Sequence, residues 1–249
     1  MHQKLADNLK RVQQRIAAAC IRGRRPPESV RLIAVTKTAS LDLIRMLIDM
    51  GVREFGENRP AELIRRAALL REAESDLEIE NAEISWHMIG HVQRNKVKML
   101  LPWVSMIQSV DSLRLAEELD QHSQKIARVT PILLEVNAGG ETSKQGVAVA
   151  ATTHLAEQIA TLRNLELRGL MCMAPLTRDE SVIKQAFERT RELFEEIVTL
   201  RTCGSTFREL SMGMSNDFEL AIAAGATMVR IGSLLFDGIE LAPQTTEAD

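Results

Sequence analysis

The sequence predicts an α/β protein built as a (β/α)8 barrel of the TIM type. Eight short, β-rich apolar segments alternate with longer amphipathic segments, which is the rhythm of repeated βα units. A length of 249 residues suits one large domain of this kind. The alternative is an open doubly wound sheet, which commonly carries a glycine-rich first turn. Neither GxGxxG nor GxxxxGK followed by Ser or Thr occurs in the chain, so we favour the barrel.

The predicted strands cover residues 30–37, 53–58, 84–90, 105–111, 130–137, 165–173, 207–214 and 227–236. Apolar residues three and four positions apart predict helices over 41–50, 112–127, 153–164 and 180–200. An extra N-terminal helix is expected because Leu5, Leu9, Val12 and Ile16 share one helical face. The acidic segment 72–83 is expected to be a solvated helix end or loop. No linker rich in Gly, Ser or Pro divides the chain, so we expect a single domain over residues 1–249.

Composition narrows the class of protein. Hydrophobic residues make up 45% of the chain, which permits a substantial core, and the net charge of −3 gives no reason to expect nucleic acid or an anionic membrane as partner. The cysteines, Cys20, Cys172 and Cys203, are odd in number and lack CxxC spacing, which argues against disulfides and thiolate metal sites. No segment approaches the roughly 18 apolar residues of a membrane span. We expect a cytoplasmic monomer.

Polar residues follow several predicted strands, at the end of the barrel where active sites form. The first strand ends in Lys37, the second in Glu57 and Asn58, the third in His87 and the fifth in Asn137. After strands seven and eight, hydroxyl and glycine residues predict an anion-binding cradle. Its members are Ser211, Gly213, Ser215, Gly232 and Ser233. Ordinary turns have the same composition, so the prediction depends on the two segments occurring together at positions where barrels bind phosphate.

Lys37 has two interpretations. A lysine at a strand end is most often a solvated cap, because ammonium groups are rarely buried without a partner. A lysine at the mouth of a barrel, facing a phosphate cradle, is also suited to Schiff-base formation with a phosphorylated aldehyde. Pyridoxal phosphate and the sugar-phosphate substrates of Schiff-base aldolases both fit that description.

Seven segments resemble, in order, the family of pyridoxal phosphate homeostasis proteins, which are single-domain relatives of the alanine racemase N-terminal barrel. They are RLIAVTKT, EFGENR, WHMIGHVQRNK, SVDSLRLAEEL, LLEVNAGGETSKQGV, LRGLMCMAP and ELSMGMSNDFELAIAAGATMVRIGSLLF. The resemblance implies that Lys37 carries the vitamin B6 cofactor pyridoxal 5'-phosphate (PLP) as an internal aldimine. It also implies that Asn58 lies near the ring and that Arg230 faces the pyridine nitrogen. The residues implied around the phosphate are Ser211, Gly213, Met214, Ser215, Gly232 and Ser233.

An arginine beside the pyridine nitrogen disfavours carbanion chemistry. A guanidinium stays protonated and only donates, so the ring nitrogen remains unprotonated and is a poor electron sink. The chain also contains no tyrosine, the second base of alanine racemases of this barrel type. The resemblance therefore implies a non-catalytic protein for PLP homeostasis and delivery to apo-enzymes. Two alternatives through Lys37 stay open, a Schiff-base lyase or aldolase and a weak racemase, and an RNA-contacting module using the basic segment 93–98 is a third.

Two further features of the sequence lie near these residues. His87 and His91 would share a face of a continuing strand, but no third ligand accompanies them, so we expect no metal site. The chain departs from the family at Arg59 and Pro60, where an aromatic residue is common. It also departs in the loop 138–146, which keeps Glu141, Lys144 and Gly146.

Overall fold

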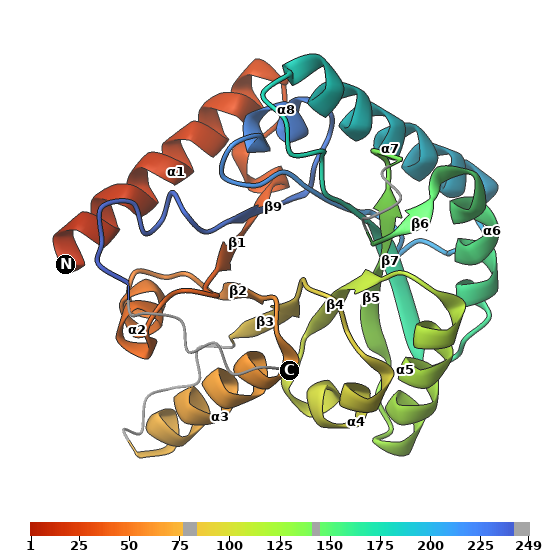
Figure 1. Ribbon diagram of the computed structural model, residues 1–249, viewed down its shortest axis with the longest axis horizontal. Helices are drawn as coiled ribbons and strands as arrows, with labels where there is room; N and C mark the ends of the chain where they lie inside the picture. The colour runs from red at the N-terminus through yellow and green to blue at the C-terminus, as the bar shows by residue number, and fades with distance from the viewer. Residues whose placement is uncertain (77–83, 141–144, 242–249) are drawn as a thin grey trace.

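The computed structural model describes residues 1–76, 84–140 and 145–241 (Figure 1). Its strands run parallel in one sheet, in the order β4-β3-β2-β1-β9-β8-β7-β5-β6, and a further pairing of β4 with β5 closes eight of them into a barrel. The predicted (β/α)8 barrel is therefore confirmed. The strands are β1 (Arg31–Val35), β2 (Glu54–Glu57), β3 (Ser85–Met88), β4 (Met106–Val110), β5 (Thr130–Asn137), β6 (Val147–Ala148), β7 (Leu165–Cys172), β8 (Glu209–Met212) and β9 (Met228–Ile231).

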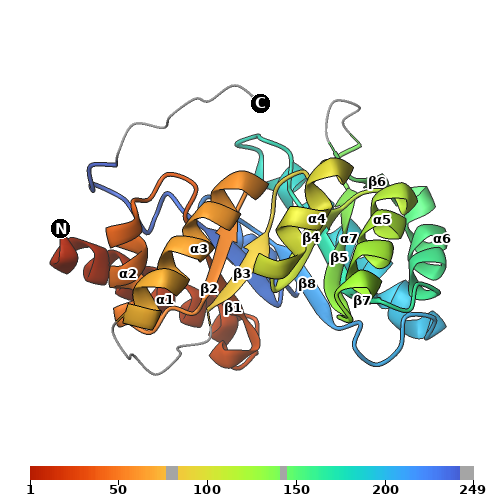
Figure 2. The same cartoon turned by 90° about the horizontal axis from the view of Figure 1, so that it is seen from below.

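Helices surround the ring of strands on its outside (Figures 1 and 2). They are α1 (His2–Arg22), α2 (Leu41–Asp49), α3 (Pro60–Asp76), α4 (Val97–Leu100), α5 (Leu113–Lys125), α6 (Val149–Ala160), α7 (Glu180–Leu200) and α8 (Phe218–Ala223). Short 3-10 turns cover Pro27–Ser29, Arg94–Lys96 and Leu101–Trp103. Side chains cap several helix starts. The hydroxyls of Ser40 and Ser112 accept hydrogen bonds from backbone N–H groups of the first turns of α2 and α5, which satisfies donors that have no partner within the helix.

Helix α1 is the predicted N-terminal helix, and it lies along the outside of the barrel beside α8 (Figure 1). Its predicted apolar face, Leu5, Leu9, Val12 and Ile16, is buried. Arg15 on the same helix bonds both carboxylate oxygens of Glu219 on α8, at 3.0 and 3.1 Å, and lies 4.8 Å from the centre of the Phe218 ring. This contact joins α1 to the helix that follows the predicted phosphate-binding segment.

Several predicted boundaries were wrong. The strands predicted to reach residues 90, 214 and 236 end at Met88, Met212 and Ile231. The chain leaves β8 because Gly213 adopts a φ of +89°, and it turns after β9 where Leu235 N–H bonds Gly232 O. The two-residue strand β6 is too short to show periodicity.

Helix α3 was not predicted because one of its core-facing positions is charged. Its buried positions Leu63, Arg66, Ala67 and Leu70 follow helical spacing. The arginine interrupts the apolar pattern that reveals a helix. Residues 77–83 of the predicted acidic segment lie outside the described residues.

The barrel has two apolar cores, one between the strands and the helices and one within the ring of strands. The inner one contains Ile33, Met106, Leu133, Met171 and Met228, all nearly fully buried. Successive residues of a strand face opposite sides, so the residues two positions further along these strands also point into the ring. In β5 and β9 those residues are charged, and they contribute to the site at the carboxyl ends of the strands.

Candidate functional site

Lys37 lies in the turn that follows β1, and its side chain is exposed. The residue before it is fixed by a buried cluster. The hydroxyl of Thr36 donates to Glu57 Oε1 at 2.7 Å, and the guanidinium of Arg66 bonds both Glu57 Oε1, at 2.5 Å, and the Thr36 carbonyl. No hydrogen bond or ion pair joins the Lys37 amine to another residue of the described chain. The amine is thus carried on a rigid strand end without being committed to a partner.

Glu57 was predicted only as a polar residue at the end of a strand, and the structure turns it away from the barrel interior. It is fully buried, and burial raises the pKa of its carboxyl despite the charge of Arg66. Its Oε2 atom has no hydrogen-bond partner among the described residues. Glu57 therefore supports the end of β1 and does not line the mouth.

Asn58, the residue after β2, is exposed at the mouth. The chain that leaves β3 packs directly against it. A Cβ atom on Gly90 would lie 2.2 Å from the Asn58 carbonyl oxygen, so only glycine fits there. The position of Asn58 thus depends on Gly90, a glycine with no distinguishing pattern around it in the sequence.

The segment between β8 and α8 forms a tight loop. A Cβ atom on Gly213 would lie 2.6 Å from the Ala221 Cβ atom and 2.7 Å from the Phe218 Cα atom, so the loop is pressed against α8. Ser215 is 8% exposed, and Met214, at 38%, reaches the surface. The Met214 N–H donates to the Asp217 carboxylate at 2.6 Å.

Unpaired backbone donors gather on this loop and on the one after β9. The N–H groups of Ser215, Asn216, Ser233 and Leu234 make no hydrogen bond to another described residue, whereas those of nearby Asp217, Phe218, Leu235 and Phe236 do. The chain at Gly232 passes close to β1, since a Cβ atom there would lie 3.1 Å from the Val35 carbonyl oxygen. Two loops with free donors therefore lie beside the strand end that carries Lys37, both on its β9 side. Such backbone nests favour anions.

Arg230 on β9 lies inside the barrel and is 3% exposed. Its Nη1 donates to Ser211 Oγ at 2.6 Å and its Nη2 to the Cys172 carbonyl at 2.9 Å. Burial lowers the pKa of the guanidinium from its ordinary value, and the nearby Cys172, Glu135 and Asp217 oppose that effect. Ser211 was predicted to lie at the phosphate. Its hydroxyl instead accepts a hydrogen bond from Arg230 and donates one to Gln108, within β8 and before the loop begins.

All nine residues predicted to bind the cofactor belong to four neighbouring strands and the turns that follow them. In the barrel these strands stand in the order β2-β1-β9-β8. Asn58 follows β2, Lys37 follows β1, Arg230 and the Gly232–Ser233 turn belong to β9, and the Ser211–Ser215 segment belongs to β8. The structure therefore brings the predicted amine, anion cradle and arginine to one side of the mouth.

Glu135, which the sequence did not single out, stands across the mouth from this group. It is on β5, four strands from β1 in either direction around the ring. It is 3% exposed, and burial raises the pKa of its carboxyl to about 7; the charge of Asp111 adds to this effect and that of Arg230 opposes it. Glu135 lies two residues after Leu133 and therefore shares its face of β5. The sequence alone does not show that this face points into the barrel.

The two histidines selected from the sequence lie apart in the structure. His87 is buried inside the barrel, whereas His91 is exposed beyond the end of β3 and lies 3.6 Å from Asp111, so the two histidines do not share a strand face as expected. The part of the chain that the structure describes holds no group of three residues placed to bind a metal ion. Glu141 and Lys144 lie outside the described residues, and Arg59 is exposed.

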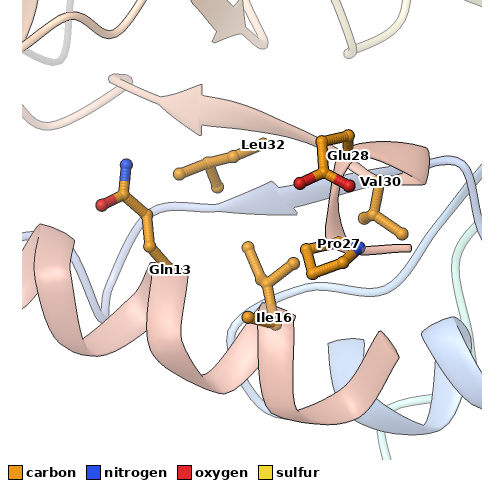
Figure 3. Close-up of a pocket in the computed structure, with 7 residues that line it drawn as sticks. Gln13, Ile16, Pro27, Glu28, Val30 and Leu32 are labelled. Atoms are coloured by element: carbon orange, nitrogen blue, oxygen red, sulfur yellow. The ribbon is translucent and has the colours of Figure 1, made fainter. Parts of the chain in front are cut away.

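A hollow of about 280 Å³ lies away from the mouth (Figure 3). Gln13 and Ile16 of α1 face Val30 and Leu32 at the start of β1 across it. None of the predicted site residues lines it. Within the described residues, no helix has the length and apolar character needed to cross a membrane.

Comparison with known proteins first defines the class. Residues 2–239 match the family model described as "Alanine racemase, N-terminal domain". The chain belongs to this class of barrel, and within it to the family of pyridoxal phosphate homeostasis proteins. A relative with that name from Aquifex aeolicus is 39% identical over 230 residues, which cover 92% of this chain and 96% of the relative.

Solved structures agree with this assignment. A protein of unknown function from Bifidobacterium adolescentis is 41% identical, with a TM-score of 0.89 over 94% of this chain and 95% of that one. PipY of Synechococcus elongatus, in a structure described as having PLP bound, is 33% identical, with a TM-score of 0.75 over 90% of this chain and 99% of that one.

Proposed function

We propose that this chain binds pyridoxal 5'-phosphate through Lys37 as one cofactor-binding domain. We further propose that it buffers the cofactor in the cytoplasm and delivers it to apo-enzymes, with little or no catalysis of its own. The names of its relatives and the PLP-bound PipY structure support a role in PLP homeostasis. One observation from this chain carries the proposal: an uncommitted lysine, two loops with unpaired N–H donors and a buried arginine meet on four adjacent strands.

These residues fit the parts of the cofactor. The loops at Ser215 and Ser233 supply donors for a dianionic phosphate, as turns after the last two strands do in other barrels. Lys37 would supply the amine that holds the aldehyde group. Arg230 supplies a donor that never becomes an acceptor. Asn58, at the mouth after β2, would lie beside the ring, and Ser211 would contribute through β8, the strand that leads into the loop.

The same residues argue against efficient catalysis. PLP, when bound, stabilises carbanions best if its ring nitrogen is protonated. A protonated ring nitrogen needs a hydrogen-bond acceptor beside it, and the guanidinium of Arg230 can only donate. The chain also has no tyrosine to act as a second base. The design suits a protein that holds its cofactor.

The purified protein, mixed with PLP, is expected to gain a visible absorbance band. Borohydride should fix the cofactor, and peptide mass spectrometry should place the modification on Lys37. Lys37→Ala should abolish both the band and the modification, whereas Lys96→Ala, at another exposed lysine, should leave them unchanged.

Two outcomes would overturn the proposal. A wild-type protein that gains no band with PLP does not hold the cofactor in this way. If borohydride instead traps a phosphorylated sugar on Lys37 in PLP-free protein, the aldolase alternative replaces it.

Glu135 favours weak racemisation as a second candidate function. It is a buried carboxyl group opposite β1, and its pKa of about 7 suits it to exchange a proton at neutral pH. In deuterated water, slow exchange of the α-proton of a bound amino acid should fall in Glu135→Gln. If Glu135→Gln exchanges the α-proton as fast as the wild type does, Glu135 is not the base.

A further inference from the structure

A line of hydrogen-bonded side chains crosses the inside of the barrel and ends on Arg230. Arg230 Nη1 lies 2.6 Å from Ser211 Oγ, Ser211 Oγ lies 2.7 Å from Gln108 Oε1, and Gln108 Nε2 lies 2.9 Å from His87 Nδ1. His87 Nε2 in turn bonds the carboxylate of Glu54. We call these five residues the Arg230 chain. They come from β9, β8, β4, β3 and β2, so the line spans the ring.

The two ends fix the direction of every hydrogen bond in the Arg230 chain. Arg230 can only donate, so Ser211 Oγ accepts from it and passes its own hydrogen onward. The Gln108 atom that faces Ser211 must then be the amide oxygen, and the amide nitrogen donates to His87. His87 Nδ1 is therefore unprotonated, and its proton is on Nε2, where the acceptor Glu54 receives it.

The burial of the Arg230 chain argues that it has a role beyond filling space. Ser211 and Gln108 are fully buried, and His87 is 2% exposed. Met106, Met171 and the other apolar residues of the inner core lie in the same part of the barrel. Apolar side chains usually fill this part of a barrel, and a buried polar network is costly unless every member is bonded. Well-packed apolar residues in place of buried charged groups are often neutral or stabilising, so stability is weak grounds for keeping such a network.

We propose that Gln108 and His87 are positioning residues for Arg230. By holding the Ser211 hydroxyl as an acceptor, they fix one arm of the guanidinium, and the Cys172 carbonyl fixes the other. The remaining N–H groups of Arg230 are then directed by the barrel and not by the ligand. The role assigned to those groups, donation to the cofactor ring nitrogen, rests on the proposed function.

Gln108→Leu and His87→Leu interrupt the Arg230 chain at two points. Because each leaves a buried donor or acceptor near Arg230 less well satisfied, we expect the dissociation constant for PLP to rise on the order of tenfold. The visible band should also move in wavelength, which a general loss of stability would not cause. His87→Gln can still accept from Gln108 and donate to Glu54, so it should restore both properties. Met171→Leu, in the same layer but outside the Arg230 chain, is the matched control.

A double substitution tests the route through Ser211. If Gln108 acts through that hydroxyl, Gln108→Leu should change the band and the dissociation constant little in a Ser211→Ala background. Full additivity of the two substitutions would overturn the proposal. So would an unchanged band in a folded Gln108→Leu protein. Gln108→Met, which is less disruptive, replaces Gln108→Leu if that variant does not fold.

A measurement without the cofactor separates this proposal from the proposed function. In the PLP-free protein, the guanidinium protons of Arg230 should exchange slowly with solvent and give resolved NMR signals, and Gln108→Leu should speed their exchange. If PLP gives no band in the wild type but the exchange still responds to Gln108→Leu, the proposed function fails and the positioning role stands. Exchange that does not respond would refute the positioning role.

Discussion

Replacing Glu135 by glutamine should make the stability of this protein less dependent on pH. The carboxyl group has a pKa of about 7 in the folded protein, against an ordinary value of 4.5, chiefly because it is buried. Between these two values the folded state holds more protons than the unfolded state. The free energy of unfolding therefore falls as pH rises through this range. Glutamine keeps the shape of the side chain and has no proton to lose.

The size of the effect follows from the interval between the two pKa values. At about 1.4 kcal/mol per pH unit, the interval from 4.5 to about 7 corresponds to about 3 kcal/mol once the pH exceeds both values. At pH 5 the carboxyl group is still protonated in the folded protein and largely ionised in the unfolded protein. The unfolding free energies of the wild type and Glu135→Gln should therefore differ by only about 1 kcal/mol at this pH. We expect Glu135→Gln to be more stable than the wild type, and its advantage to grow by about 2 kcal/mol between pH 5 and pH 8.

Urea unfolding at pH 5, 6 and 8, followed by tryptophan fluorescence, measures this difference. Other buried carboxyl groups, such as Asp217 and Glu57, also have raised pKa values, so the quantity of interest is the variant minus the wild type at each pH. Glu188→Gln, an exposed position on α7, should show a constant difference near zero. An advantage of Glu135→Gln that is equal at pH 5 and pH 8 would refute the electrostatic account of the site.

Two substitutions test the supports of the mouth. Gly213→Ala places a Cβ atom at a φ of +89° and 2.7 Å from the backbone of α8, so it should lower the unfolding free energy by about 2 kcal/mol or more and weaken PLP capture. A urea midpoint and visible band like those of the wild type would contradict this. Arg66→Met leaves the buried Glu57 carboxylate without its cation and should cost about 3–5 kcal/mol in urea unfolding. Adding Glu57→Leu should recover much of the loss, and no recovery would count against a buried ion pair.

The sequence indicates candidate site residues where the signal is local to one segment. Lys37 and the Gly213–Ser215 loop were predicted because strand ends and glycine turns carry their own signals, and the barrel follows from the alternation of strands and helices. The structure added the adjacency of their strands, which depends on closure of the ring by β4 and β5.

The sequence analysis did not select residues whose position depends on other elements of the fold. Arg66 interrupts the apolar spacing of α3, and its partners Glu57 and Thr36 belong to other segments of the chain. Gln108 and Glu135 lie inside apolar strands, and one residue of register decides whether such a side chain meets the ring interior or the helices. That register is set by pairing between distant strands, so single-segment patterns do not contain it.

The Arg230 chain also bears on why this site would hold a cofactor more than use it. A line of hydrogen bonds that begins at an arginine does not deliver a proton to the site, because the guanidinium does not release one at physiological pH. The direction fixed at that end runs away from the mouth, through Gln108 to the carboxylate of Glu54. A cofactor nitrogen beside Arg230 would therefore meet a fixed donor without a proton supply. Firm positioning of the cofactor ring and weak electron withdrawal by that ring would then have the same structural cause, which is the arginine at position 230.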